Sequence, residues 1–152
     1  MVNFRVAMKS DLTLLVALLA DDAVASARET AQVLAAHEKA FAAITDDPNH
    51  ELLVAEVDGQ LMGFCQLSFL PGLTYAGGWR AQIEGVRVAP QARGQGIGAQ
   101  LIHEAIERAR RRSCVLVQLT TDQRRSDALS FYLKMGFVDS HRGMKLRLDQ
   151  SL

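Results

Sequence analysis

The sequence lacks an uninterrupted run of about 18 apolar residues, the length that a membrane-spanning helix requires. Its first residues, Met1 to Arg5, have neither the basic start nor the apolar stretch of a secretory signal peptide. Seventeen basic and seventeen acidic residues give a net charge of zero, so no broad electrostatic surface is left for a nucleic acid. We therefore expect a cytoplasmic protein that binds neither membranes nor nucleic acid.

The chain is also poor in cysteine. Cys65 and Cys114 form no C-x-x-C pair, and both fall at or inside expected strands, where a thiol usually packs as a small apolar side chain. The four histidines are scattered along the chain without metal-ligand spacing. We expect no metal site and no cysteine nucleophile.

What the chain does have is enough length and apolar content for one domain, with 152 residues of which 49% are hydrophobic. Asp58-Gly59 between two apolar runs predicts a type I′ hairpin. Hydrophobic periodicity indicates an α/β domain over residues 1–152, with a mixed sheet of about six to seven strands and helices on both faces. The expected strands are residues 3–7, 52–57, 60–69, 82–88, 115–121, 137–140 and 144–148, and the expected helices are residues 12–19, 29–44, 98–111 and about 128–135.

The most informative motif is Arg93-Gly94-Gln95-Gly96-Ile97-Gly98, which lies where an expected strand is followed by an expected helix. Glycine allows the backbone to approach an anion closely, and the first amides of a helix have no intrahelical acceptor, so this place suits a phosphate. A P-loop is excluded, because Ala99-Gln100 stands where lysine and a hydroxyl residue are needed.

Two glycine loops remain as candidates. The dinucleotide fingerprint G-x-G-x-x-A is satisfied by Gly94, Gly96 and Ala99, with Asp122 at about the expected distance of ~20 residues. Residues 89–93 separate this loop from its strand, however, and too little chain follows for the remaining parallel strands. The other candidate is the R-x-x-G-x-G loop that holds the pyrophosphate of coenzyme A, which Arg93, Gly96 and Gly98 match.

With this loop the chain resembles the GNAT superfamily of N-acetyltransferases. In that family a strand precedes the loop, a long helix and a second strand follow it, and a short helix ends in A-x-x-F-Y-x-x-x-G-F. The sequence has these parts in the same order and ends the last one in Ala128-Leu129-Ser130-Phe131-Tyr132-Leu133-Lys134-Met135-Gly136-Phe137. The resemblance covers roughly the C-terminal half, which is locally similar to the branch containing aminoalkylphosphonate N-acetyltransferases.

The resemblance implies acetyl-CoA as the acetyl donor and a site between splayed strands. In the family the strand before the loop pairs with the pantetheine arm through its backbone, so Val86 and Val88 should supply main-chain groups. The pyrophosphate should lie against the loop. The loop residues expected there are Arg93, Gly94, Gln95, Gly96, Gly98 and Ala99.

Two residues are expected to carry the chemistry, because an ammonium must lose a proton before it attacks and the departing thiolate must gain one. Glu84 is an acid inside an apolar strand, and by alternation it shares a face with Gln82 and Val86. It would act as general base or bind the amine; the alternative is a merely structural carboxylate, at a strand edge or in a salt bridge. Tyr132 matches the family tyrosine that gives its proton to the coenzyme sulfur, with a core position as the alternative.

The sequence says less about the acetyl acceptor than about the acetyl donor. Residues 70–79, residues 21–28 and Glu84 should form its pocket, with Tyr75 and Trp79 covering a ligand. Many family members have asparagine where this chain has Arg125, which puts one amide contact to the coenzyme in doubt. We expect a small-molecule amine as acceptor. The alternatives are a protein amine, and a non-catalytic acyl-CoA sensor or subunit.

Relatives also commonly pair as dimers through sheet edges. Residues 144–148 would form such an edge in this chain, and an exposed edge strand needs cover. A homodimer is therefore expected as well.

Overall fold

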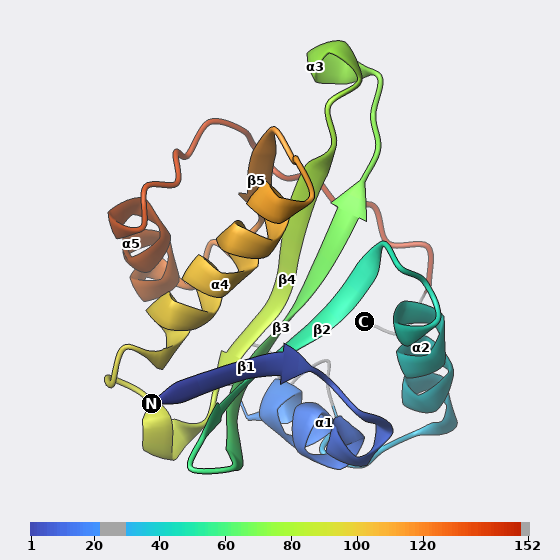
Figure 1. Cartoon of the computed structure of the whole chain (residues 1–152), viewed down its shortest axis with the longest axis vertical. Helices are drawn as coiled ribbons and strands as arrows, with labels where there is room; N and C mark the ends of the chain where they lie inside the picture. The colour runs from blue at the N-terminus through green and yellow to red at the C-terminus, as the bar shows by residue number, and fades with distance from the viewer. Residues whose placement is uncertain (22–29, 150–152) are drawn as a thin grey trace. The chain divides into compact units, whose positions relative to one another are not determined.

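The computed structural model describes residues 1–21 and 30–149. The chain divides into two compact units, Met1–Leu119 and Thr120–Leu152, and each is described by itself. The elements drawn in Figure 1 are β1 (Val2–Val6), η1 (Lys9–Asp11), α1 (Leu12–Ala20), α2 (Ala35–Thr45), β2 (His50–Val57), β3 (Gln60–Leu70), α3 (Thr74–Gly77), β4 (Arg80–Val88), η2 (Pro90–Ala92), α4 (Ile97–Arg111), β5 (Leu116–Leu119) and α5 (Ser126–Lys134).

The first unit is built on a mixed sheet with the strand order β1-β2-β3-β4-β5. The first four strands pair antiparallel with their neighbours, and β5 pairs parallel with β4. Asp58 and Gly59 connect β2 to β3 with φ angles of 50° and 76°, as a type I′ turn requires. The α/β class, the mixed sheet and this hairpin are as the sequence predicts.

Helices cover both faces of the sheet. On one face α1 and α2 pack against a cluster of buried side chains that includes Leu52, Val54 and Phe64. On the other face α4 buries Leu101 and Ile102 completely. The apolar stripe of α4 explains its position, because it recurs at the helical period and leaves the charged residues outside.

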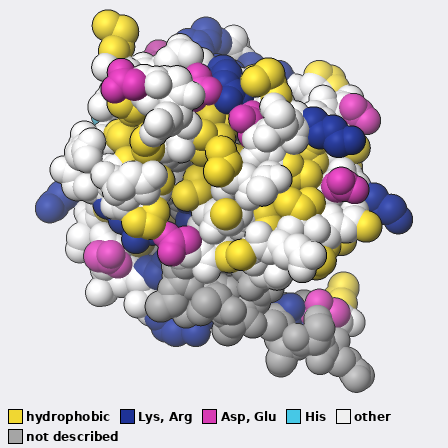
Figure 2. Space-filling view, turned by 90° about the horizontal axis from the view of Figure 1, so that it is seen from below, with side chains coloured by type: hydrophobic (Ala, Val, Ile, Leu, Met, Phe, Trp, Pro, Cys, Tyr) yellow, Lys and Arg dark blue, Asp and Glu magenta, His cyan; other side chains and the backbone are white. Residues whose placement is uncertain are grey.

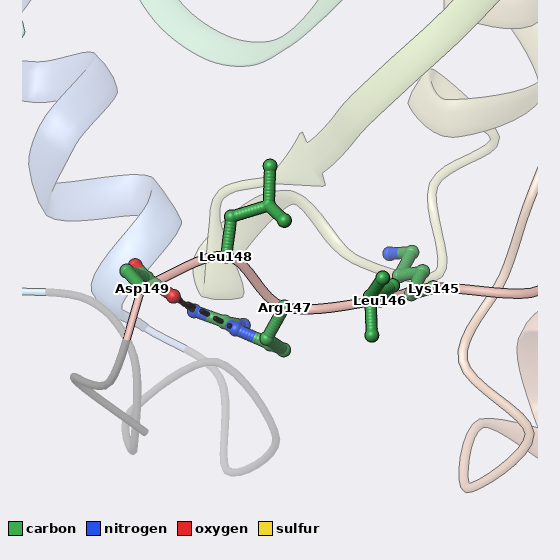
Figure 3. A pocket seen from close by; sticks show the side chains of 5 residues that line it. All are labelled: Lys145, Leu146, Arg147, Leu148 and Asp149. Atoms are coloured by element: carbon green, nitrogen blue, oxygen red, sulfur yellow. Dashed lines mark hydrogen bonds and ion pairs between the residues drawn. The ribbon is translucent and has the colours of Figure 1, made fainter.

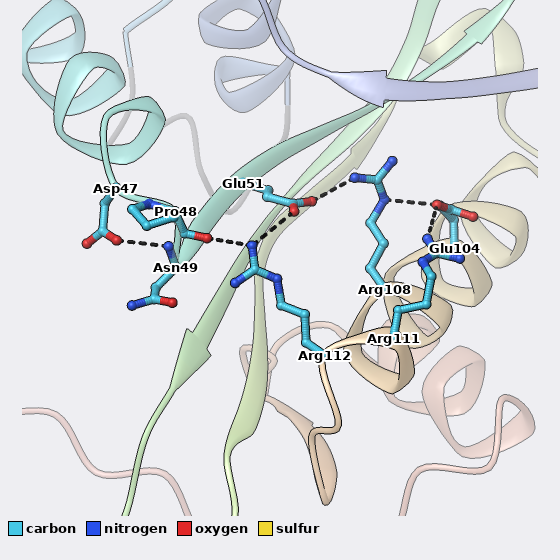
Figure 4. A network of polar contacts seen from close by, with 8 residues as sticks. All are labelled: Asp47, Pro48, Asn49, Glu51, Glu104, Arg108, Arg111 and Arg112. Atoms are coloured by element: carbon cyan, nitrogen blue, oxygen red, sulfur yellow. Dashed lines mark hydrogen bonds and ion pairs between the residues drawn. The ribbon is translucent and has the colours of Figure 1, made fainter.

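Ion pairs hold the C-terminal end of α4 against the sheet. Arg108 donates to Glu51 of β2 at 2.8 Å and to Glu104 of its own helix at 2.9 Å, as Figure 4 shows. Arg112 also binds the Pro48 carbonyl, and its guanidinium lies 4.0 Å from the centre of the Phe69 ring. These contacts fix the helix whose first turn follows the glycine motif.

The sequence prediction of six to seven strands is wrong for the described residues, which form five. Residues 137–140 and 144–148 belong to no strand. The alternation of Met144, Leu146 and Leu148 does predict a strand, but an isolated two-stranded hairpin is at best marginally stable in water. All three side chains are at least 87% exposed, so the alternation has no buried face to pack against. The edge strand on which we based the expected homodimer is therefore absent from the described residues.

The helix expected at residues 29–44 begins at Ala35, and residue 29 lies outside the described residues. The helix expected at residues 12–19 is present as α1, preceded by one turn of 3-10 helix. In the described part of the chain, no helix is both long and apolar enough to span a membrane. On the face shown in Figure 2, basic and acidic side chains are interspersed, and neither sign forms a continuous area.

The two cysteines differ. Cys65 is completely buried in β3, and burial raises the pKa of its thiol to about 12. It therefore packs as an apolar side chain, as expected. Cys114 is only half-buried, although burial raises its pKa as well.

Asp11 joins the start of the first helical segment to β1. Its carboxylate accepts from the Arg5 guanidinium at 2.7 and 3.0 Å and from the Met8 amide at 2.7 Å, and it is 7% exposed. The Arg5 hydrogen bonds hold the pKa of Asp11 below its ordinary value, although burial acts in the opposite direction. The ion pair therefore stabilises the fold above the unfolded-state pKa of about 3.9 and is lost as pH falls through the lower, folded-state pKa.

We expect Asp11→Asn to lower the free energy of unfolding at pH 7 by about 1.5–3 kcal/mol, because it removes charge-assisted hydrogen bonds. Urea unfolding at pH 7 and pH 3 measures the effect, and the difference from the wild type should shrink at pH 3. Asp58→Asn is the matched control, since asparagine tolerates the left-handed turn position. A difference of equal size at both pH values would contradict this role for the ion pair.

Candidate active site

The glycine motif forms the connection between η2 and α4. Ala92 and Ile97 are buried at its two ends, and the four residues between them are exposed. Gly94 and Gly96 have φ angles of 76° and 78°, which residues with a Cβ rarely adopt. Gly96 is the N-cap of α4, so the amides of the next residues point out of the helix without intrahelical acceptors. This is the local structure that the motif predicts for an anion site.

Arg93 connects this loop to two other elements. Its Nε donates to the Val88 carbonyl at 3.2 Å, and its guanidinium contacts the backbone and the carboxylate of Asp21 at 3.4 and 3.5 Å. The Arg93 side chain is 55% exposed, and ion pairs this exposed contribute little to stability. Its guanidinium can therefore exchange Asp21 for another anion at little energetic cost.

Strand β4 extends beyond its parallel partner. The ladder with β5 ends at the pair Ile83 and Leu119, and β4 continues to Val88 (Figure 1). The Ala89 amide donates to the Met62 carbonyl of β3, so the backbone groups of the preceding residue, Val88, point to the opposite edge of the strand. Beyond Ile83, therefore, β4 has no parallel partner strand in the first unit.

A bulge at Gly85 changes the pattern of side chains along β4. Glu84 lies opposite Gln66 and Arg87 lies opposite Phe64, so the pairing skips a residue, and Gly85 has a φ of 63°. The expectation that Val86 shares the face of Glu84 is therefore wrong, because the extra residue shifts the alternation and puts Arg87 on that face. Val86 lies within this bulge, and its carbonyl accepts from the Arg87 side chain at 2.9 Å.

Glu84 is exposed on the face of the sheet that carries α1 and α2. It forms no ion pair with another described residue, so its carboxylate is accessible to a ligand. The salt-bridged alternative therefore does not hold in the described part of the chain.

Tyr132 lies near the end of α5 in the second unit. Gly136 ends this helix with a φ of 97°, and the Phe137 amide donates to the Tyr132 carbonyl at 3.1 Å. The chain thereby folds back, and the half-buried Tyr132 ring meets Phe131 and Phe137 edge to face, with centroids 5.1 and 5.7 Å apart. The F-Y-x-x-x-G-F motif is thus a helix end that packs three rings together. Arg125 is the N-cap of the same helix.

Of the residues expected to contact the acetyl acceptor, two precede β4 and one lies within it. Tyr75 is in α3 at the tip of the β3–β4 hairpin and is 59% exposed, while Trp79 immediately precedes β4 and is 38% exposed. Glu84 lies five residues further along the strand. Of residues 21–28, only Asp21 is among the described residues.

Sequence interpretation missed the bulge at Gly85 and the alignment of Arg80 with Gln82 and Glu84 on one face of β4. An isolated glycine inside a strand pattern signals a bulge, and this signal was present. Arg80 shares the alternation of Gln82 and Glu84, which also could have been noticed. The hollow drawn in Figure 3 is lined by Lys145, Leu146, Arg147, Leu148 and Asp149, none of which is an expected site residue, and Arg147 pairs with Asp149 within it.

The mixed sheet, the glycine loop at the start of α4 and the open edge of β4 define an acetyltransferase fold. The family model described as Acetyltransferase (GNAT) family matches residues 16–137, more than half of the chain, and the protein belongs to this family. The match begins well before the C-terminal half in which the resemblance is visible from the sequence.

Individual relatives were also found. The chain is 39% identical over 101 residues to aminoalkylphosphonate N-acetyltransferase of Salmonella typhimurium, covering 66% of this chain and 65% of that protein. It is 36% identical over 90 residues to glucosamine 6-phosphate N-acetyltransferase of Trypanosoma brucei brucei, covering 59% of each. The matches thus span less than two thirds of these curated relatives. The crystal structure of a transcriptional regulator from Bacillus halodurans C-125 is similar at a TM-score of 0.94 and 47% identity, covering 97% of this chain and 100% of that one.

Proposed function

We propose that the protein is an acetyl-CoA-dependent N-acetyltransferase that transfers the acetyl group to a primary amine of a small molecule. Transfer would be direct, in a ternary complex of enzyme, acetyl-CoA and amine. The observation that carries this proposal is the open edge of β4, which ends at a loop whose backbone amides point outward. A thioester arm added along that edge would bring its diphosphate to those amides.

In this proposal the coenzyme is held mainly by backbone groups. Val86 and Val88 pair with the pantetheine arm, and Arg93 leaves Asp21 to contact the diphosphate. The rest of the diphosphate site is formed by Gly94, Gln95, Gly96, Gly98 and Ala99. No metal is needed, because amides and a guanidinium supply the positive charge.

The chemistry needs one base and one acid. Glu84 takes a proton from the ammonium, directly or through a water, and the amine nitrogen attacks the thioester carbonyl carbon. The carbon–sulfur bond then breaks, and the Tyr132 hydroxyl gives a proton to the thiolate. The acetylated nitrogen loses its second proton, which restores the Tyr132 hydroxyl. The exposed carboxylate of Glu84 supports its role as the base. The match of Tyr132 to the family motif supports its role as the acid.

A small-molecule acceptor is supported by the names of the two curated relatives, both of which are named for small amines. Tyr75 and Trp79 would then line the far end of the acceptor site, beyond Glu84 along β4. A non-catalytic acyl-CoA sensor is the second candidate, because the Bacillus halodurans structure is described as a transcriptional regulator.

Release of free thiol from acetyl-CoA in the presence of a panel of amines separates the two candidates. An enzyme should release thiol continuously with at least one amine, over many turnovers per protein molecule. A sensor should bind acetyl-CoA in calorimetry and release no thiol beyond the rate without protein. That second result would refute the proposed activity.

Glu84→Gln should lower kcat/KM about 10²–10⁴-fold near neutral pH, the range typical of general acid–base catalysis. High pH should rescue part of this loss, since the medium then supplies the free amine that the carboxylate would have produced. The measurement is a pH profile of kcat/KM for both proteins, with the exposed Glu38→Gln as matched control. If kcat/KM depends on pH in the same way in Glu84→Gln and in wild type, Glu84 is not the general base.

A further inference from the structure

A row of polar side chains crosses the sheet on the face that carries α1 and α2. The ladders place His50 opposite Ser68, Ser68 opposite Gln82, and Gln82 opposite Gln118. His50 Nδ1 lies 2.8 Å from Ser68 Oγ, and Gln118 Nε2 donates to Gln82 Oε1 at 2.9 Å. The row brings hydroxyl, amide and imidazole groups together, and it contains no carboxylate.

Arg80 lies beside this row, two residues before Gln82 on the same face of β4. Its Nε is buried and makes no hydrogen bond, and its guanidinium forms no ion pair with any residue in the described ranges. Its Cζ lies 4.0 Å from the position that a Cβ on Gly72 would occupy, so no side chain of residue 72 covers the guanidinium there.

Two other arginines of the first unit are paired with carboxylates. Arg5 pairs with Asp11 and Glu56, and Arg108 pairs with Glu51 and Glu104. A partly buried guanidinium without a carboxylate loses hydration and gains no partner, which is unfavourable unless a ligand supplies the anion. Guanidinium groups bind phosphate, phosphonate and carboxylate oxygens in bidentate geometry.

The spacing of Arg80 and Glu84 limits which acceptor molecules could contact both side chains. The two residues are four positions apart on one strand face, which corresponds to roughly 13 Å along the strand. This is a backbone spacing, and both side chains are long, so a compact acceptor that carries an amine and an acidic group can contact both residues.

We propose that the sheet face between Glu84 and Arg80 binds an acetyl acceptor that carries an acidic group as well as the amine, with Arg80 binding that group. Gln82 lies between the two ends, where it can donate to the middle of the ligand. The proposal rests on the proposed function, because Glu84 is taken as the residue that receives the amine.

Matched pairs of acceptors test this assignment and distinguish the kinds of acidic group. Suitable pairs are glucosamine 6-phosphate with glucosamine, 3-aminopropylphosphonate with 3-amino-1-propanol, and 4-aminobutyrate with 4-amino-1-butanol. For wild type, kcat/KM should favour the acidic member of at least one pair by about 10- to 100-fold, the value of a charge-assisted hydrogen bond.

Arg80→Met should reduce that preference at least tenfold, mainly through a higher KM for the acidic member, and Arg80→Lys should restore part of it. Arg110→Met, at a side chain 70% exposed, is the matched control and should keep the wild-type ratio. Equal use of both members of every pair by wild type would overturn the proposal, as would an unchanged ratio in Arg80→Met.

If the proposed function itself is wrong, the result differs: no amine causes release of thiol from acetyl-CoA. In that case calorimetry of the coenzyme A complex with the acidic member of each pair still tests the site. Binding that Arg80→Met weakens at least tenfold would support it, and no binding would overturn it.

Discussion

Replacing Gly96 with aspartate should lower the affinity for acetyl-CoA at least a hundredfold. Gly96 has a φ of 78° at the N-cap of α4, where outward amides would face the diphosphate. An aspartate there adds a like charge beside the diphosphate. A charge-assisted hydrogen bond contributes about 1.5–3 kcal/mol, so the loss of two or more exceeds about 2.7 kcal/mol, which corresponds to a hundredfold.

Backbone strain must be separated from the effect of charge. Any residue with a Cβ in the left-handed conformation costs about 1–2 kcal/mol, so Gly96→Ala reports that cost alone. Gly77→Asp is the matched control, because Gly77 has a φ of 79°, has no atom within 4 Å of the position that a Cβ would occupy, and lies at the other end of β4. Titration calorimetry with acetyl-CoA measures all three variants. Unchanged affinity in a folded Gly96→Asp protein would show that the loop does not hold the diphosphate.

The sequence predicts the loop and its helix well because both depend on local signals. Gly94 and Gly96 require positive φ, and the apolar stripe of α4 recurs over a long segment. The hairpin at Asp58-Gly59 is local in the same sense, since both residues favour the type I′ turn.

The C-terminal hairpin was mispredicted because alternation alone does not make a strand. Met144, Leu146 and Leu148 alternate as a half-buried strand would, but a strand also needs a partner backbone and a surface to cover. In residues 137–149 no strands pair, and these three side chains cover no surface. The predicted strands that do form are the ones with hydrogen-bonded neighbours in the sheet.

Register explains the remaining difference at the candidate site. The alternation of Arg80, Gln82 and Glu84 can be read along one strand. Ser68 and Gln118 lie opposite Gln82 and become its neighbours only when β3 and β5 pair with β4. A bulge at Gly85 then shifts every later side chain to the other face. A row of polar residues across several strands can therefore be identified only from the structure. The polar residues that follow one another on β4 can be identified from the sequence.

Tyr132→Phe should lower kcat about 10²–10⁴-fold, the usual contribution of a positioned general acid. The substitution removes one hydroxyl and keeps the ring, which makes edge-to-face contacts with Phe131 and Phe137. One lost hydrogen bond costs about 1 kcal/mol, so the unfolding midpoint should fall by only about 2–4 °C. The affinity for acetyl-CoA should change little, because the backbone of the glycine loop is untouched.

A second variant separates the hydroxyl from the ring. Tyr132→Leu also loses both aromatic contacts, each contributing about 0.5–1.5 kcal/mol beyond burial, so it should be less stable than Tyr132→Phe and no more active. Steady-state kinetics with chemistry shown to be rate-limiting, together with thermal unfolding, measure both properties. If kcat of Tyr132→Phe stays within threefold of wild type while Tyr132→Leu unfolds at a lower temperature, Tyr132 is a packing residue. The thiolate must then take its proton from another group, because loss of the hydroxyl would have left the chemical step intact.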